Sequence, residues 1–258
     1  MNILDKIIAV KREEIKKYTP TTTTVQKDFP QKSRLADRLR QGPGVIAEIK
    51  RASPSKGDIR TDVNVAGQAK IYERAGAAAI SVLTDESYFK GSIADLEEVA
   101  SLVSVPVLCK DFIVDRVQID RAKNAGATII LLIVAALEQA ELEELFAYAQ
   151  REGMEVLVEI HELKELEVAL DLGAELVGVN NRNLKTFDVS LERTAEIAQH
   201  FPDSGNALLI SESGIVSVND AQFAFSKGAS GILVGEALMR SEDAGAWIET
   251  VTSQEVAK

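Results

Sequence analysis

The chain has 258 residues, 46% of them hydrophobic, and its 40 acidic and 29 basic side chains give a formal net charge of −11. This balance argues against non-specific binding to nucleic acid or to an acidic membrane surface, so neither is expected as a partner. A single cysteine, Cys109, excludes an internal disulfide, and no apolar run is long enough to cross a bilayer, so we expect a cytoplasmic protein.

The first 43 residues are predicted to form a helical extension. Residues 3–17 place apolar side chains at helical spacing among charged ones, which indicates an amphipathic helix and not a signal peptide. A connector with four threonines follows at 21–24, and a second short helix is expected at 33–40. We expect this extension (1–43) and a catalytic barrel (44–258) to form one domain. The extension either caps the N-terminal face of the barrel or acts as a lid at the opposite face.

From residue 44 onward, short apolar segments alternate with helical patterns eight times. The predicted strands are GVIAEIK (44–50), AAISVLT (78–84), VPVLCK (105–110), TIILLIV (128–134), EVLVEI (155–160), LVGVN (176–180), ALLISES (207–213) and SGILVG (230–235). Such alternation is typical of a parallel sheet, and eight units in this length predict a closed (β/α)8 TIM barrel. An open doubly wound sheet is the alternative, but the first βα turn lacks a G-x-G-x-x-G motif.

Polar side chains gather where these strands end, which is the face of a TIM barrel that carries the chemistry. Glu48 and Lys50 interrupt an apolar strand two residues apart, so the alternation of side chains can place both inside the barrel. Lys110 and Glu159 are flanked by apolar residues and are the best candidates for shifted pKa values and for proton transfer. Burying unpaired charge costs several kcal/mol, so a barrel mouth that collects both signs indicates function.

The last two units carry glycines where a strand meets a loop or a short helix. Gly214 lies in SESGI and Gly235 in GILVGEALM. Backbone N–H groups at such turns, with a helix N-terminus, bind anions, and TIM barrels bind phosphate in this region. The sequence therefore predicts a phosphate site, with the alternative that both glycines only permit tight turns.

Six motifs in chain order resemble the indole-3-glycerol phosphate synthase family. They are VIAEIKRASPSKG (45–57), VLCKDFIVD (107–115), LVEIH (157–161), GVNNRNLKTF (178–187), LISESGI (209–215) and ILVGEALM (232–239). The resemblance spans nearly the whole chain, and the N-terminal extension is also typical of that family. It implies a carboxy-lyase of tryptophan biosynthesis that closes a ring in 1-(2-carboxyphenylamino)-1-deoxyribulose 5-phosphate, with loss of carbon dioxide and water. It implies no metal and no cofactor, and we expect a monomer or a weak homodimer.

The same resemblance implies roles for single residues. Lys110 resembles the general acid that protonates the ketose carbonyl, and Glu159 the acid or base that completes dehydration. Lys50 resembles the partner of the substrate carboxylate, and Glu48 would orient the lysines. The implied substrate-binding residues are Asn180, Arg182, Glu212, Ser213, Phe112 and Phe89, and the implied phosphate-binding residues are Ser53, Gly214, Gly235 and Glu236.

Two other functions remain open from the sequence. A phosphoribosylanthranilate isomerase would share the glycine phosphate site without needing the set Glu48, Lys50, Lys110 and Glu159. A sensor for a phosphorylated ligand would be expected to lack Lys110 or Glu159. Cys109 should point away from Lys110 toward the helices, and His161 is expected to begin the next helix and not to bind a metal.

Overall fold

A computed structural model describes residues 3–18, 28–184, 186–202 and 205–253. Within them, eight parallel strands close into a barrel in which β1 pairs with both β4 and β10. The strands are β1 (Gly44–Ile49), β4 (Ala79–Leu83), β5 (Val107–Lys110), β6 (Ile129–Ile133), β7 (Glu155–Ile160), β8 (Leu176–Asn180), β9 (Leu208–Glu212) and β10 (Gly231–Val234). Each lies within the segment predicted for it, so the (β/α)8 TIM barrel is confirmed.

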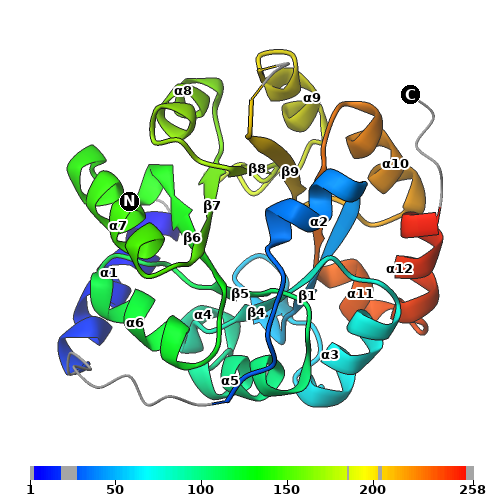
Figure 1. The fold of residues 1–258 in the computed structure, drawn as a ribbon, viewed down its shortest axis with the longest axis horizontal. Coiled ribbons are helices and arrows are strands. Elements are labelled where there is room, and N and C mark those ends of the chain that lie inside the picture. Colours follow the sequence, from blue (N-terminus) through cyan, green and yellow to red (C-terminus); the bar gives the residue numbers. More distant parts are fainter. Residues whose placement is uncertain (1–2, 19–27, 185, 203–204, 254–258) are drawn as a thin grey trace.

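Helices surround the strands, as Figure 1 shows. The longer ones are α3 (Val65–Arg74), α5 (Ile93–Leu102), α6 (Arg116–Asn124), α7 (Gln139–Arg151), α8 (Leu163–Asp171), α9 (Glu192–Ala198), α10 (Val218–Ser226) and α12 (Ala244–Ser253). Short elements follow the strands at their C-terminal ends: the hairpin of β2 (Ala52–Ser53) and β3 (Gly57–Asp58), α4 (Glu86–Phe89), η2 (Val134–Ala136) and α11 (Glu236–Arg240). None of the helices in these ranges is long and apolar enough to cross a membrane.

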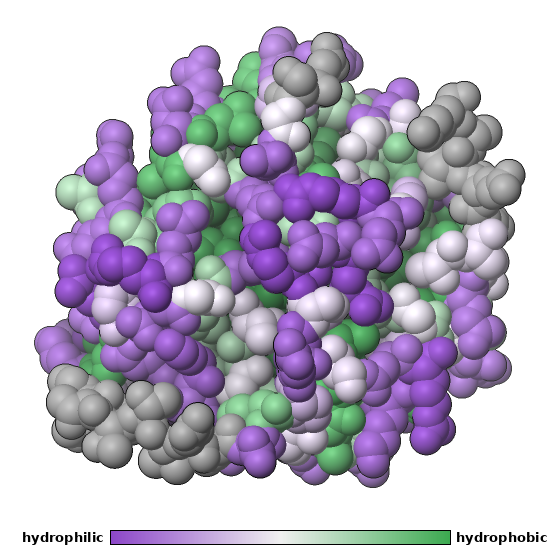
Figure 2. Space-filling view, in the orientation of Figure 1, coloured by the Kyte–Doolittle hydropathy of each residue, from purple (hydrophilic) through white to green (hydrophobic). Residues whose placement is uncertain are grey.

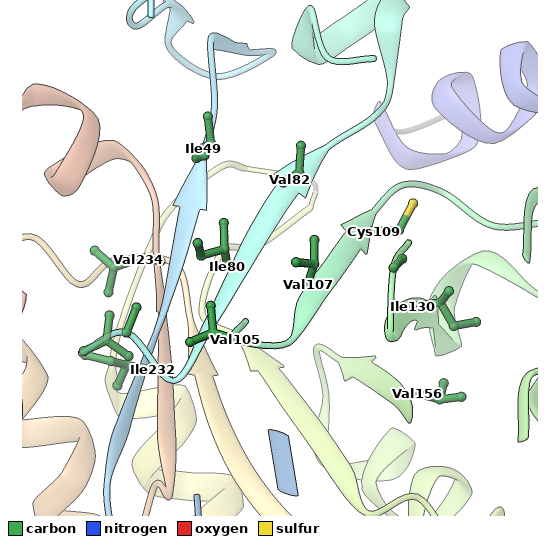
Figure 3. Packing of buried hydrophobic residues seen from close by; sticks show 14 of the residues in the cluster. Ile49, Ile80, Val82, Val105, Val107, Cys109, Ile130, Val156, Ile232 and Val234 are labelled. Carbon is green, nitrogen blue, oxygen red and sulfur yellow. The ribbon is translucent and has the colours of Figure 1, made fainter. Parts of the chain in front are cut away.

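The alternation of side chains along each strand divides the interior into two clusters. Outward residues such as Val107, Cys109 and Ile130 pack under the helices, as Figure 3 shows. Inward residues such as Leu108 and Leu157 form a second cluster inside the barrel. Each buried aliphatic side chain contributes about 1.5–3 kcal/mol, so the two clusters together fix the register of every strand. Cys109 lies on the outward side, as predicted.

The second helix of the extension, α2 (Leu35–Gln41), covers the N-terminal face of the barrel. Its Leu39 side chain lies against the first residues of β1 and β10, so an added Cβ at Gly44 would meet that side chain at 2.7 Å. Glu155 at the start of β7 accepts hydrogen bonds from the backbone N–H groups of Leu35 and Ala36, at 2.7 and 3.0 Å. The helix lies across the strands in Figure 1, and Figure 2 shows mainly hydrophilic residues over it.

The first helix, α1 (Ile3–Glu14), continues into η1 (Ile15–Lys17) and lies at the opposite face. Its Leu4 joins the inward cluster at the barrel mouth. The helix predicted at 3–17 is therefore confirmed, whereas the second helix begins at Leu35, two residues later than predicted. The connector predicted at 21–24 lies outside the described residues. The extension supplies both a cap and a mouth-covering helix, although the sequence analysis treated these as alternatives. The boundary at residue 43 stays a prediction.

A buried ion cluster holds α1 at the mouth. Lys11 is 3% exposed, and its Nζ lies 2.8 Å from Asp85, 3.0 Å from Asp111 and 3.0 Å from Glu14. Burial alone would lower the pKa of Lys11, but the charges of Asp111 and Asp85 outweigh it and raise that pKa well above its ordinary value. The ammonium group therefore allows Asp85 and Asp111, the carboxylates that follow β4 and β5 in the chain, to be largely buried.

We predict that Lys11→Met lowers the free energy of unfolding by about 3–5 kcal/mol, because it leaves buried carboxylates without their cation. Methionine keeps the apolar part of the lysine side chain, so the loss of unfolding free energy measures the contribution of the charge. Lys16→Met is the matched control, since Lys16 is 67% exposed and pairs with exposed Glu13, and it should cost less than about 1 kcal/mol. Urea unfolding followed by circular dichroism measures both. Equal losses in the two variants would contradict a role for the buried cluster.

Candidate active site

A cavity of about 170 Å³ opens at the C-terminal ends of the barrel strands. It is lined by thirteen of the fourteen predicted site residues: Glu48, Lys50, Ser53, Phe89, Lys110, Phe112, Glu159, Asn180, Arg182, Glu212, Ser213, Gly235 and Glu236. The fourteenth, Gly214, does not line it. The structure therefore brings residues from seven of the strand ends to one cavity.

Lys110, at the end of β5, lines this cavity. Its Nζ lies 3.1 Å from Glu212 Oε2 on β9 and 3.5 Å from Glu159 Oε2 on β7. Burial works to lower the pKa of Lys110, but the charges of Glu212, Glu159 and Glu48 outweigh burial and raise it above its ordinary value. Lys110 is consequently an ammonium ion, the form that carries a proton to donate.

The two carboxyl groups beside Lys110 differ in protonation. For Glu159, burial favours the neutral acid, but the charge of Lys110 and a hydrogen bond from Asn180 Nδ2 at 3.1 Å outweigh burial and lower its pKa. For Glu212, burial dominates, the charge of Glu159 adds to it, and the pKa rises to about 8 despite Lys110. At neutral pH the site therefore holds an ionised base and a neutral acid on either side of one cation.

Glycines on neighbouring strands make room for these carboxyl groups. An added Cβ at Gly178 on β8 would lie 2.0 Å from Glu212 Oε1, and one at Gly235 would lie 2.4 Å from Glu48 Oε1. Glu48 in turn lies 2.5 Å from Lys50 Nζ. The mid-strand glycine and the glycine after β10 thus allow charged side chains to fill positions that apolar side chains occupy lower in the barrel.

Comparison with known proteins shows the family of this chain. A profile described as indole-3-glycerol phosphate synthase matches residues 4–251. The chain belongs to this family. A protein named indole-3-glycerol phosphate synthase from Exiguobacterium sibiricum is 51% identical over 256 residues, covering 97% of each chain. One of the same name from Oceanobacillus iheyensis is 55% identical over 197 residues, 76% of this chain and 75% of that protein.

A solved structure supports the barrel fold alone. Thiamine phosphate pyrophosphorylase from Pyrococcus furiosus superposes with a TM-score of 0.61 at 17% identity, over 85% of this chain and 96% of the other. At this identity the likeness concerns the arrangement of strands and helices. The activity must therefore be argued from the residues of the cavity.

An aromatic wall faces the charged cluster. The rings of Phe89 and Phe112 lie with centroids 5.9 Å apart at 36°, and both line the cavity as predicted. Other apolar residues that line the cavity were not predicted from the sequence, namely Ile3, Leu4, Ile7, Leu83, Leu131, Ile133, Leu184, Phe187, Ile215, Leu233 and Val234. Those of α1 could not be found by strand parity, because they reach the mouth from the extension.

Gly214 and His161 depart from their predicted places. Gly214 has φ +83°, and an added Cβ would lie 2.5 Å from Val189 Cγ1, so the turn explains this glycine without a ligand. His161 does not begin a helix, because α8 starts at Leu163, and its ring lines the cavity. The alternation of side chains along the strand could have predicted this, since His161 follows Glu159 by two residues and so points to the same side. Among the described residues, no group of His, Cys, Asp and Glu is arranged to hold a metal ion.

We predict that the stability of Glu212→Gln relative to the wild type rises between pH 5 and 8. The pKa of Glu212 is about 8 in the fold and near 4.5 in the unfolded chain, so across this window the unfolded state releases a proton that the folded state keeps. The wild type therefore loses stability as the pH rises, and glutamine removes this loss, which is worth roughly 2–4 kcal/mol at 1.36 kcal/mol per unit.

Urea unfolding at several pH values measures this difference. Glu192→Gln is the control, because Glu192 is exposed at the start of α9, and its difference from the wild type should stay constant. A constant difference for Glu212→Gln as well would show that Glu212 is not a neutral acid in the fold.

Proposed function

We propose that this protein acts as an indole-3-glycerol phosphate synthase, a carboxy-lyase of tryptophan biosynthesis, through the residues of the barrel mouth. It converts 1-(2-carboxyphenylamino)-1-deoxyribulose 5-phosphate to indole-3-glycerol phosphate, carbon dioxide and water. Membership of the family supports this reaction. The observation that carries the assignment of residues is Lys110, a buried ammonium between one ionised and one neutral carboxyl group.

Ring closure needs an acid at the ketose carbonyl. As the aromatic carbon attacks, negative charge develops on the carbonyl oxygen, and Lys110 donates the proton that neutralises it. Lys50 is exposed enough at 19% to pair with the substrate carboxylate, and Glu48 holds its ammonium group in place at 2.5 Å. Loss of carbon dioxide then restores the aromatic ring.

Dehydration needs an acid for the leaving hydroxyl and a base for the proton that is lost. Glu159 is the base, because its lowered pKa keeps it ionised, and Asn180 fixes one of its oxygens. Glu212 and Ser213 face the ribulose hydroxyl groups, and Arg182 lies beside the anthranilate portion. Phe89 and Phe112 form the apolar wall against the anthranilate ring. A sensor would have no use for an acid and base pair, and an isomerase would not need the full set Glu48, Lys50, Lys110 and Glu159.

The phosphate is proposed to bind beside β2 and α11. Ser53, Gly235 and the backbone at Glu236 border the cavity on this side, and Lys56 lies 3.6 Å from the Glu236 carboxylate. Gly214 supports the site only through the turn that it permits. An anion here would meet a hydroxyl group and backbone N–H groups at the start of a short helix.

We also propose a cytoplasmic monomer or weak homodimer whose partner is the phosphosugar–anthranilate substrate, without nucleic-acid or membrane partners. The charge of −11 supports this. So does the distribution of exposed large apolar residues in the described ranges: Val10, Ile71, Leu102 and Val216 lie on separate segments, and Phe187 and Val189 share the loop between β8 and α9. Light scattering after size exclusion at several concentrations tests the oligomeric state.

We predict that Lys110→Ala lowers kcat by about 10² or more, the loss expected for a positioned acid. Purified protein is mixed with the substrate without added metal or cofactor, and indole fluorescence is followed. Lys164→Ala is the control, since Lys164 is 77% exposed and pairs with Glu162, and it should keep normal kcat. No product from the wild type would overturn the function, whereas normal kcat in Lys110→Ala would remove only this residue from the mechanism.

We predict different kinetics for two substitutions at the phosphate side. Ser53→Ala should raise KM about tenfold, roughly 1.4 kcal/mol, with little change in kcat, because it removes a contact made equally to substrate and transition state. Gly235→Ala should also lower kcat, because its Cβ would lie 2.4 Å from Glu48 Oε1 and 3.1 Å from Lys50 Nζ. An unchanged KM in both variants would place the phosphate elsewhere.

A further inference from the structure

His161 lies at the edge of the charged cluster, between two carboxylates. Its ring is 6% exposed and lines the cavity. Nε2 lies 3.3 Å from Glu159 Oε1, and Nδ1 lies 3.9 Å from Glu165 Oε2. Neither ring nitrogen is aligned for a hydrogen bond to any described residue. Buried polar groups nearly always have such a partner, so a ring that faces a carboxylate on each side without bonding either one requires an explanation.

The main chain of His161 is held by two hydrogen bonds, whereas its ring nitrogens have none to the described residues. Its backbone N–H donates to Glu165 Oε2 at 2.6 Å, and its carbonyl oxygen accepts a hydrogen bond from Arg193 Nη1 on α9. These bonds fix the chain where β7 ends and α8 begins. A small rotation of the ring would bring Nε2 into line with Glu159 without moving the backbone.

The proposed reaction takes up one proton in each turnover. The substrate enters with an ionised carboxylate group, which leaves as neutral carbon dioxide, and a hydroxyl group leaves as water. The balanced reaction is therefore substrate anion plus one proton, giving indole-3-glycerol phosphate, carbon dioxide and water. Lys110 donates at the first step, so the site must recover a proton from solvent before the next turnover.

We propose that His161 returns this proton to the site by passing it to Glu159, which reloads Lys110. The N–H bond at Nε2 breaks as an O–H bond forms on Glu159, and the acid then gives its proton to the neutral Lys110 amine. The ring begins this step as the imidazolium ion, because Nδ1 has first taken a proton from water by way of Glu165, and it ends as neutral imidazole with its proton on Nδ1. Exchange with water then moves that proton to Nε2 and restores the starting form. His161 acts through Glu159: it is a positioning residue that delivers the proton to this carboxylate and does not contact the substrate itself. The need for a proton rests on the proposed function, whereas the coupling of the ring to Glu159 does not.

The groups around the ring suit this transfer. Glu159 faces it from β7 and Glu165 from α8, Arg193 of α9 lies at its backbone carbonyl, and Lys110 and Glu212 lie beyond Glu159. The lowered pKa of Glu159 keeps this carboxylate ionised and able to accept a proton, because the charges of Lys110 and His161 outweigh its burial. Imidazole is the side-chain group that exchanges protons on two nitrogens near neutral pH.

The first test compares His161→Gln with the wild type in kcat, KM and pH profile. We expect kcat to fall about tenfold or more with KM within about threefold, because the substrate contacts remain while proton return slows. His200→Gln is the matched control, since His200 is the other histidine of the chain and is exposed on the outer surface. A normal kcat and pH profile in His161→Gln would overturn the proposal.

The second test uses added imidazole with His161→Ala. We expect imidazole to raise kcat in this variant as its concentration increases, and to have no effect on Lys110→Ala or on the wild type. A purely structural role for the ring would give lost activity that imidazole does not restore. That result would overturn the proposal even if His161→Gln is slow.

A third measurement does not depend on activity. In protein with isotope-labelled histidine rings, nuclear magnetic resonance follows the titration of His161 and His200. We expect the His161 midpoint to move to lower pH in Glu159→Gln, because the ring loses its anionic neighbour, while His200 does not change. An unmoved His161 midpoint would overturn the coupling, whatever reaction the protein catalyses. Absence of product from the wild type would instead refute the proposed function.

Discussion

Lys110 is the charge on which the barrel mouth depends. Without its ammonium group, Glu159 and Glu212 would share a buried space with no cation between them, and neither could ionise cheaply. With it, only the carboxyl group that has further support ionises. The charge of His161 and the hydrogen bond from Asn180 give that support to Glu159, so Glu212 keeps the proton. One cation therefore creates a difference between two chemically identical side chains, and acid–base chemistry needs that difference.

Backbone geometry allows this cluster to form at all. Inward positions low in the barrel carry leucine and isoleucine, and the same parity at the strand ends carries Glu48, Lys110, Glu159 and Glu212. A full set of side chains would not fit there. Gly178 leaves the space that Glu212 fills, so the glycine and the carboxyl group form one steric unit across two strands. The residues at the barrel mouth are thus set by the space available between neighbouring strands as well as by chemistry.

The sequence predicted the features that follow from a strong hydrophobic period along the chain. It did not predict the features that depend on the distance between side chains in the folded protein. All eight strands follow from apolar runs, and Lys110 and Glu159 were found because charge interrupts those runs. The protonation of Glu212 was not predictable, because it depends on how close Lys110 and Glu159 lie to it. His161 was misplaced because the next helix was expected to begin at it, whereas β7 ends at Ile160 as predicted and α8 begins only at Leu163. Gly178 gave a usable signal, a glycine within a strand, but the carboxyl group that explains it lies 34 residues further along the chain.

The extension couples the stability of the barrel to its chemistry. TIM barrels usually keep these apart, with stability at the N-terminal face and chemistry at the other. Here α2 follows that division, whereas α1 does not. Lys11 binds Asp111, which follows Lys110 directly, and Leu4 of the same helix closes the inward cluster beside the cavity. Because the ion cluster that holds α1 also fixes the chain next to the catalytic lysine, the position of Lys110 depends on a helix 99 residues earlier in the chain.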